Sequence, residues 1–239
     1  MEVKIQHKQN SIQANIEHVN NSGTWLLFIA GGSLEKGRYR YYEWQNILIK
    51  KHINTLSFDH AGIGGSTGTK TTSSLADRIK ETEKVLTWLT QHYYVSKIHI
   101  FASSMGGYVA LGLHYLICKK IDKIILFAPA AYSKKAHTLK FDSTFTNEIR
   151  QQRSWRDSLS YEWMDTFQKP ILLLIPEKDD IIPTEITHKY KQIIARKNNA
   201  FSETLFGCKH DCWGDTVEEK RHRQDIFIRT TLFLHKTES

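Results

Sequence analysis

The stretch KIHIFASSMGGYVALGLHYLI, residues 97–117, changes its pattern halfway along. Its first part is an apolar, β-branched run typical of a buried strand, and its second part has the apolar content of a buried helix. Two serines, a methionine and two glycines separate the two parts. A strand that passes into a helix through so short a connection predicts a sharp, crowded turn at Ser104.

The neighbours of the two serines decide which side chain can project from this turn. The residues two before and two after a projecting side chain must be small, because their backbones crowd together. Ser104 has Ala102 and Gly106 at these positions, whereas Ser103 has a phenylalanine and a methionine. We therefore predict Ser104 as a nucleophile, because the amino terminus of the following helix favours negative charge beside it. A serine that only caps the helix is the alternative.

The rest of the chain alternates short apolar runs with helical patterns, which is typical of a mostly parallel sheet covered by helices on both faces. The expected strands are residues 24–30, 53–59, 97–103, 122–130, 170–176 and 201–207. Alternating polar and apolar residues over 3–8 and 13–19 predict an antiparallel edge hairpin around Asn10, and helices are expected over 71–93 and 217–236. The fold class is therefore α/β.

One segment is too long for an ordinary connection between two strands. We interpret residues 134–168 as a short cap inserted into a single domain of residues 1–239. The aromatic and methionine residues of this region are Phe141, Phe145, Trp155, Tyr161, Trp163, Met164 and Phe167. They either roof an apolar pocket or attach the insertion to the core. Arg150, Arg153 and Arg156 are expected to face solvent, with recognition of an anionic substrate as the alternative.

Composition narrows the class of protein. The 239 residues include 33 basic and 25 acidic side chains, which gives a net charge of +8. This excess is spread along the chain, so we expect weak attraction to anionic surfaces at low salt and no nucleic-acid partner. No run of about 18 apolar residues and no signal-peptide pattern is present, so a cytoplasmic location is expected.

Two other motifs are incomplete. Residues 59–72, DHAGIGGSTGTKTT, have the setting of a phosphate loop, but the second glycine of that loop is absent, and Thr67 replaces the third glycine of a dinucleotide-binding turn. A loop that positions another group is expected, with nucleotide binding as the alternative. Cys208 and Cys212 could form half of a zinc site, but no second pair of ligands follows, so no metal is expected.

Two later strands are followed by an acid and by a base. Asp179 and Asp180 follow the strand at 170–176, and His210 follows the strand at 201–207. Serine, aspartate and histidine in this chain order meet at the carboxyl edge of a parallel sheet in one type of hydrolase. His210 can take a proton from Ser104 and return it to a leaving group.

Five stretches in order resemble the α/β-hydrolases, and within them the monoacylglycerol lipase and serine aminopeptidase group. The resemblance covers about residues 24–235. The stretches are FIAGGSLEKGRYRYYEW (28–44), FDHAGIGGSTG (58–68), FASSMGG (101–107), PEKDDIIP (176–183) and GCKHD (207–211). Ala30, Ala61, Ile63 and Ala102 stand where this group usually has histidine, arginine, histidine and glycine, respectively.

The resemblance implies a serine hydrolase that needs no metal or organic cofactor. Ser104 would be the nucleophile and His210 the base. Asp179 would be the acid because it lies four residues before a proline, with Asp180 as the alternative. The backbone N–H groups of Gly32 and Met105 would form the oxyanion hole.

The implied substrate is an ester, a thioester or a small amide, cleaved through an acyl-enzyme, as by a carboxylesterase or lipase. The aromatic residues of the expected cap favour a substrate with a medium-sized apolar group. Two other functions stay open. The three replaced loop positions, Ala30, Ala61 and Ile63, are compatible with a binding protein that has lost catalysis. An acyltransferase would use the same residues as the hydrolase.

Overall fold

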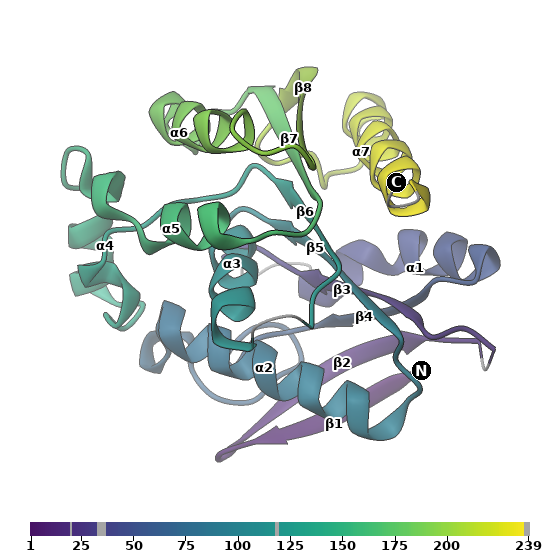
Figure 1. Cartoon of the computed structure of the whole chain (residues 1–239). Helices are drawn as coiled ribbons and strands as arrows, with labels where there is room; N and C mark the ends of the chain where they lie inside the picture. The colour runs from purple at the N-terminus through teal and green to yellow at the C-terminus, as the bar shows by residue number, and fades with distance from the viewer. Residues whose placement is uncertain (20, 33–36, 118–119, 237–239) are drawn as a thin grey trace.

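The computed structural model describes residues 1–19, 21–32, 37–117 and 120–236. These residues form an open eight-stranded sheet with the order β1-β2-β4-β3-β5-β6-β7-β8 (Figure 1). The strands are β1 (Glu2–His7), β2 (Asn10–Glu17), β3 (Thr24–Ile29), β4 (Asn54–Phe58), β5 (Lys97–Ser103), β6 (Lys123–Phe127), β7 (Ile171–Lys178) and β8 (Ala200–Lys209). Strand β2 is antiparallel to β1 and β4, and the other neighbouring pairs are parallel. The expected α/β class with a mostly parallel sheet is confirmed.

The edge hairpin turns slightly earlier than expected. Its turn lies at Lys8 and Gln9, with Lys8 at φ 53°, and Asn10 already belongs to β2. Ile5 and Ile12 face each other across the two strands, and both are fully buried. Burial of this pair sets the register, because a shift by one residue would turn both side chains to the opposite face.

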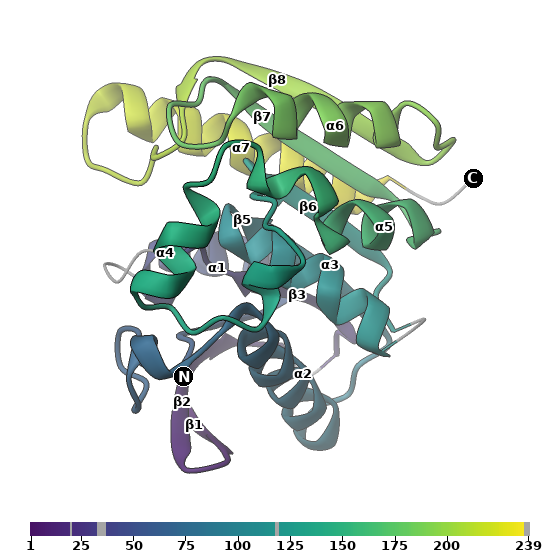
Figure 2. The ribbon, with the colours of Figure 1, turned by 90° about the vertical axis from the view of Figure 1, so that its left-hand side faces the viewer.

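Helices cover both faces of the sheet (Figures 1 and 2). The α-helices are α1 (Tyr42–Leu48), α2 (Leu75–His92), α3 (Met105–Ile117), α4 (Ser143–Ile149), α5 (Leu159–Thr166), α6 (Thr184–Ile194) and α7 (Val217–His235). Short 3-10 helices span Gly37–Tyr41, Ile49–Lys51, Lys70–Thr72, Lys135–His137 and Ser154–Asp157. No described helix has an apolar stretch long enough to cross a membrane.

Each face of the sheet has its own core. On β3, Trp25, Leu27 and Ile29 belong to the core under α2, α3, α5 and α6, while Leu26 and Phe28 belong to the core under α1 and α7. Successive side chains of a strand point to opposite faces, so an uninterrupted apolar run serves a sheet that is buried on both sides. This is why the inner strands read as continuous apolar runs in the sequence.

The two longest helices begin at capped residues. Helix α2 starts four residues later than expected, because Lys70–Thr72 form a 3-10 turn and the Ser74 side chain then accepts a hydrogen bond from the Asp77 N–H. Helix α7 starts with a capping box, in which Thr216 and Glu219 satisfy each other's backbone N–H groups. Neither α1 nor α6 is among the helices that we expected from the sequence.

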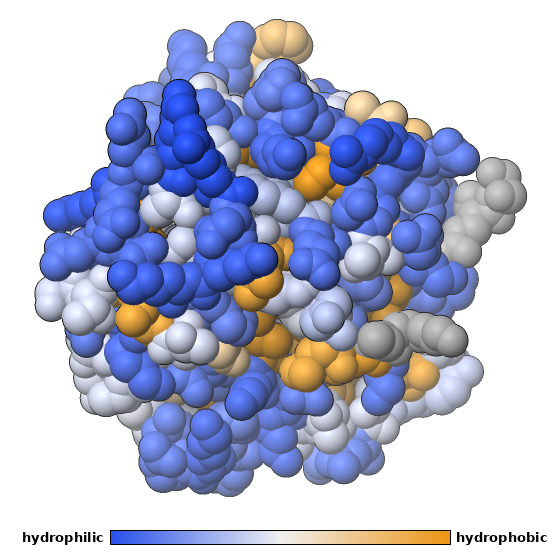
Figure 3. All heavy atoms as spheres, turned by 60° about the vertical axis from the view of Figure 1, so that its left-hand side comes forward, coloured by the Kyte–Doolittle hydropathy of each residue, from blue (hydrophilic) through white to orange (hydrophobic). Residues whose placement is uncertain are grey.

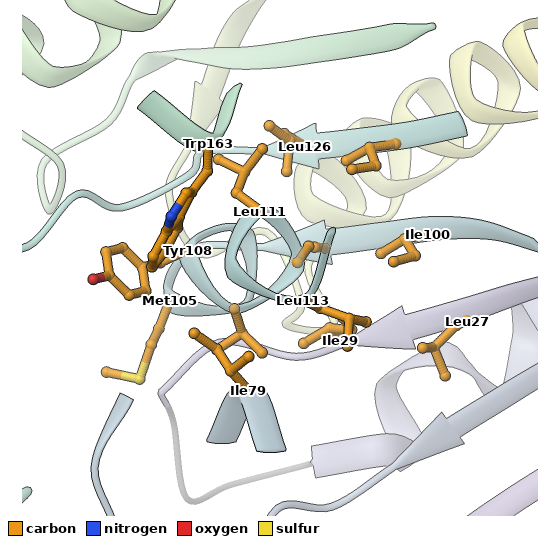
Figure 4. Close-up of a cluster of buried hydrophobic side chains, with 14 of the residues drawn as sticks. Leu27, Ile29, Ile79, Ile100, Met105, Tyr108, Leu111, Leu113, Leu126 and Trp163 are labelled. Carbon is orange, nitrogen blue, oxygen red and sulfur yellow. The ribbon is translucent and has the colours of Figure 1, made fainter. Parts of the chain in front are cut away.

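The segment between β6 and β7 carries α4 and α5, and α5 lies beside α3 (Figure 2). Trp163 of α5 lies against Tyr108 of α3, with ring centroids 5.1 Å apart (Figure 4). Six of the seven aromatic and methionine residues named for this region are buried in the core, and Trp155 packs against it. Their burial attaches the segment to the core, and its role as a cap stays a prediction.

The outer surface of this region is polar. Arg150, Arg153 and Arg156 are all exposed, as expected for a solvated face. The space-filling view of this side is mostly hydrophilic, with apolar side chains in several patches (Figure 3).

Candidate functional site

Ser104 lies between the last residue of β5 and the first residue of α3. Its φ angle is 53°, in the left-handed region that residues other than glycine rarely adopt. Three backbone hydrogen bonds hold this conformation: the Ser104 N–H donates to Phe127 O, and Ser104 O accepts from the N–H groups of Gly107 and Ala130, at 2.9, 2.9 and 3.0 Å. The strained turn therefore presents a half-buried serine side chain at the carboxyl edge of the sheet.

The small neighbours of Ser104 are required by close packing. A Cβ atom at Gly106 would lie 2.3 Å from the carbonyl oxygen of Ile29, and Ala102 is fully buried. Ser103 points elsewhere, because it is 2% exposed and its hydroxyl lies 3.3 Å from the hydroxyl of Tyr41. Of the two serines, only Ser104 reaches the histidine loop.

His210 connects Ser104 to a carboxylate. Its Nε2 atom lies 3.1 Å from Ser104 Oγ, and its Nδ1 atom lies 3.0 Å from Asp179 Oδ2. The side chains of His210 and Asp179 are 13% and 8% exposed. The structure therefore brings the three predicted residues into one hydrogen-bonded chain, from loops that follow β5, β7 and β8.

Asp179 is held by the backbone of its own loop. Its Oδ1 atom accepts hydrogen bonds from the N–H groups of Ile181 and Ile182, at 3.0 and 2.8 Å. Burial alone would raise the pKa of this carboxyl, but the hydrogen bonds from His210, Ile182 and Ile181 hold its pKa below the ordinary value. Asp180 is exposed, and the carboxylate that contacts His210 is that of Asp179.

The turn after β3 lies against Ser104 and Met105. A Cβ atom at Gly31 would be 3.1 Å from Ser104 Cβ, and one at Gly32 would be 3.1 Å from Met105 Cε. The Lys70 ammonium donates to the Gly32 carbonyl at 3.0 Å. Gly32 and Met105 are thus neighbours beside the serine, and their N–H groups as an oxyanion hole stay a prediction.

The glycine-rich loop after β4 folds around the carboxylate of Asp59. The Asp59 carboxylate accepts from the guanidinium of Arg38, from the Arg38 N–H at 2.7 Å and from the Gly65 N–H at 3.0 Å. Gly37 and Gly64 both have positive φ angles, and a Cβ atom at either would collide with this carboxylate. The loop therefore joins residues 37–41 to residues 59–68.

Arg78 lies behind the site and is fully buried. Its Nη1 atom lies 3.3 Å from the sulfur of Met105, and its guanidinium lies 4.6 Å from the ring centroid of Phe141. Burial lowers the pKa of Arg78 to about 10. The sequence does not single out this residue, because a lone arginine in an amphipathic helix is usually exposed.

A cavity of about 100 Å³ adjoins Ser104 and His210. Arg40 and Trp213 contribute to its wall, and the Arg40 guanidinium lies 5.4 Å from the ring centroid of Trp213. Neither residue was predicted as part of the site. In the sequence, Arg40 could have been connected with the site only through its position two residues after the Gly-Arg pair of the GRYRYYEW stretch.

Three other polar residues near His210 lie outside this chain of hydrogen bonds. Asp211 is exposed and accepts from the Trp213 N–H at 3.1 Å. Cys208 and Cys212 are buried free thiols, and their mutual hydrogen bond together with burial raises the pKa of Cys212. Among the described residues, no group of three or more His, Cys, Asp or Glu side chains could hold a metal ion.

Solved structures of other proteins have the same fold as this chain. The structure resembles Est1E from Butyrivibrio proteoclasticus with ferulic acid bound, with a TM-score of 0.72, 17% identity and coverage of 98% of this chain and 100% of that chain. It also resembles an esterase from Exiguobacterium antarcticum, with a TM-score of 0.72, 13% identity and coverage of 98% and 100%. A thioesterase domain of the curacin biosynthetic pathway has a TM-score of 0.72, 15% identity and coverage of 99% of both chains.

Sequence comparison gives the family. An uncharacterised protein of Acanthamoeba polyphaga mimivirus is 28% identical over 180 residues, which cover 69% of this chain and 60% of that protein. The family described as serine aminopeptidase, S33, matches residues 24–163, which is more than half of the chain. The chain therefore belongs to the serine aminopeptidase family S33 and has the α/β-hydrolase fold.

Proposed function

We propose that this protein is a hydrolase that cleaves esters or thioesters through an acyl-enzyme formed on Ser104. The observation that supports this most strongly is the hydrogen-bonded chain from Ser104 through His210 to Asp179. A serine hydroxyl is a weak nucleophile unless a base takes its proton, and His210 lies within reach of that proton. An exposed, unpaired serine would not support this chemistry.

In the first half of the reaction, Ser104 Oγ attacks the carbonyl carbon of the substrate while its proton moves to His210 Nε2. Asp179 accepts a hydrogen bond from His210 Nδ1 and stabilises the imidazolium. The backbone N–H groups of Gly32 and Met105 stabilise the oxyanion, each contributing about 100-fold or more in rate. His210 then returns the proton to the leaving alcohol or thiol, whose bond to the acyl carbon breaks.

In the second half, a water molecule attacks the acyl carbon of the acyl-enzyme, and His210 takes a proton from this water. The tetrahedral intermediate then collapses, Ser104 leaves with the proton from His210, and the carboxylic acid is released. Each half-reaction returns His210 to its starting protonation state. This chemistry uses only side chains and backbone groups of the chain.

The substrate is proposed to carry a medium-sized apolar group. Phe127 and Trp213 provide apolar walls of the cavity beside Ser104. Relatives of this fold include an esterase and a thioesterase domain, and Est1E binds ferulic acid, which supports an oxygen or sulfur ester rather than an amide. Initial rates on p-nitrophenyl esters of increasing acyl length test this preference, and a flat profile would count against it.

The experiment that tests the nucleophile is intact-mass analysis after treatment with a fluorophosphonate. Ser103→Ala is the matched control, because Ser103 is the adjacent serine and its hydroxyl faces Tyr41. We expect one adduct on the wild type and on Ser103→Ala, and none on Ser104→Ala. A folded wild type that takes no adduct would contradict the proposal and favour a binding protein without catalysis.

A further inference from the structure

A second, larger cavity lies at the opposite edge of the sheet from Ser104. Its volume is about 540 Å³, compared with about 100 Å³ beside the serine. It is formed where β3, β5 and β6 begin, with the residues just before β4 and the end of α7. Parallel strands bring their amino ends together at one edge, so this cavity is separate from the site at the carboxyl ends.

The wall of this cavity is strongly basic. Its lysines are Lys51, Lys97, Lys123 and Lys236. Three histidines also line it, and Asp122 is the carboxylate among the residues described there. Asp122 Oδ2 already accepts a hydrogen bond from the Ile98 N–H at 2.8 Å. Lys51 and Lys97 are exposed, and neither forms an ion pair with a described carboxylate.

Lys123 builds part of this wall into the fold. It is 5% exposed, and its ammonium donates to the carbonyl oxygens of Phe233, Leu234 and Lys236 at 3.1, 3.1 and 2.6 Å. These bonds attach the end of α7 to the start of β6 and offset the negative end of the helix dipole. The positive charge of Lys123 therefore has a fixed position at the cavity.

His99 is a buried part of the same wall. It lines the cavity, is 4% exposed, and its Nδ1 atom is buried without a hydrogen-bond partner among the described residues. Burial, followed by the charges of Lys123 and Lys97, lowers the pKa of His99 to about 3, so its ring is neutral at pH 7. The neutral His99 ring adds no negative charge, so the basic character of this wall comes from its four lysines.

We propose that this basic cavity binds a small phosphate-bearing anion, such as pyrophosphate or the diphosphate of a small organic molecule. Several lysines around one cavity act as point charges and suit an anion with more than one negative charge. The volume is within the range of about 300–1,000 Å³ that is typical of small-molecule sites. The cations surround a hollow instead of following an extended ridge, which favours a small ligand over a nucleic acid.

Isothermal titration of the full chain with sodium pyrophosphate tests this proposal. At about 50 mM sodium chloride we expect a Kd below about 1 mM that weakens as salt is added. The double variant Lys51→Glu/Lys97→Glu is expected to bind at least about tenfold more weakly, because both charges reverse at the cavity. Both side chains are exposed, so the fold should be retained, which a thermal melt checks.

The matched control is Lys189→Glu/Lys220→Glu, which changes the net charge equally at exposed positions on α6 and α7 away from the cavity. It should bind pyrophosphate within about threefold of the wild type. Equal losses in both double variants would show an effect of net charge only and would overturn the proposal, as would a wild type that gives no titration.

Two further titrations identify the source of the phosphate. Tighter binding of adenosine diphosphate than of pyrophosphate would indicate an organic diphosphate, and tighter binding of pyrophosphate would indicate the free anion. Binding of duplex DNA without binding of pyrophosphate would refute a small-molecule site. Fluorophosphonate labelling of Ser104 should be unchanged in both double variants, because this inference does not depend on the proposed hydrolysis.

Discussion

Replacing Asp179 with asparagine should disable the site by reversing one hydrogen bond. The N–H groups of Ile181 and Ile182 both donate to Oδ1 of Asp179. The asparagine oxygen must take that position, because its NH₂ group cannot accept these bonds. The NH₂ group then faces His210 Nδ1 and donates to it. His210 must consequently carry its own proton on Nε2, which faces Ser104 and can no longer act as a base.

The expected loss is large and specific. Forcing the wrong histidine tautomer in a serine triad lowers kcat by about 10⁴, which corresponds to about 5 kcal/mol of activation free energy. Asp180→Asn is the matched control, because Asp180 is the neighbouring carboxylate and is exposed. We expect Asp180→Asn to keep kcat within about threefold of the wild type, since an exposed charge that makes no hydrogen bond to His210 contributes little to catalysis.

Steady-state hydrolysis of p-nitrophenyl butyrate by the wild type and both variants measures this difference. Thermal melts of the three proteins show whether each one is folded. The rate of fluorophosphonate labelling should fall together with kcat in Asp179→Asn, because both report the nucleophilicity of Ser104. The reasoning is refuted if Asp179→Asn keeps more than about a tenth of the activity, or if Asp180→Asn loses as much as Asp179→Asn.

Three other changes have outcomes that follow from the contacts. Asp59→Asn removes the buried carboxylate that pairs with the Arg38 guanidinium and leaves it only the half-exposed Glu2 as an ionic partner, which should lower the free energy of unfolding by about 3–5 kcal/mol. Asp225→Asn, which breaks a surface pair, should cost about 0.5 kcal/mol or less. Urea unfolding compares the two, and equal values would contradict this account of the loop. Gly106→Ala places a Cβ atom 2.3 Å from the carbonyl oxygen of Ile29 and should destabilise the protein by about 3 kcal/mol, seen as a Tm lower by about 6–12 °C; an unchanged Tm would mean that the turn can relax. Because folding lowers the pKa of Asp179, its ionisation stabilises the protein above its ordinary pKa of 3.8, and this contribution is lost as the pH falls through the folded pKa. The difference in unfolding free energy between the wild type and Asp179→Asn should therefore shrink below about pH 4, and a difference that grows there would contradict the sign.

The sequence by itself predicts the sheet and the turn at Ser104, because the signals for both are local. Apolar runs such as 97–103 and 170–176 mark strands buried on both faces, and the small residues beside Ser104 reflect crowding within a few residues of chain. The chain order of serine, aspartate and histidine then places these groups at one edge, because parallel strands end together there.

Other parts of the site depend on contacts between distant residues. Asp179 and Asp180 are adjacent acids in the same loop, and only the folded backbone of Ile181 and Ile182 shows which one faces His210. The glycine-rich stretch at 59–68 does not indicate that Asp59 pairs with Arg38, because Arg38 lies 21 residues away in the sequence. A sequence pattern reports the period of an element and says little about which distant side chains that element meets.

The basic cavity shows the same limit most clearly. Lys51, Lys97, Lys123 and Lys236 are scattered along the chain, and each looks like an ordinary surface lysine in its own segment. Their charges act together only because the sheet brings the amino ends of its strands to one edge, with the last helix ending beside them. Local sequence thus determined the elements and the strained serine, while tertiary structure decided which distant charges meet, because electrostatic interactions depend on distance in space and not along the chain.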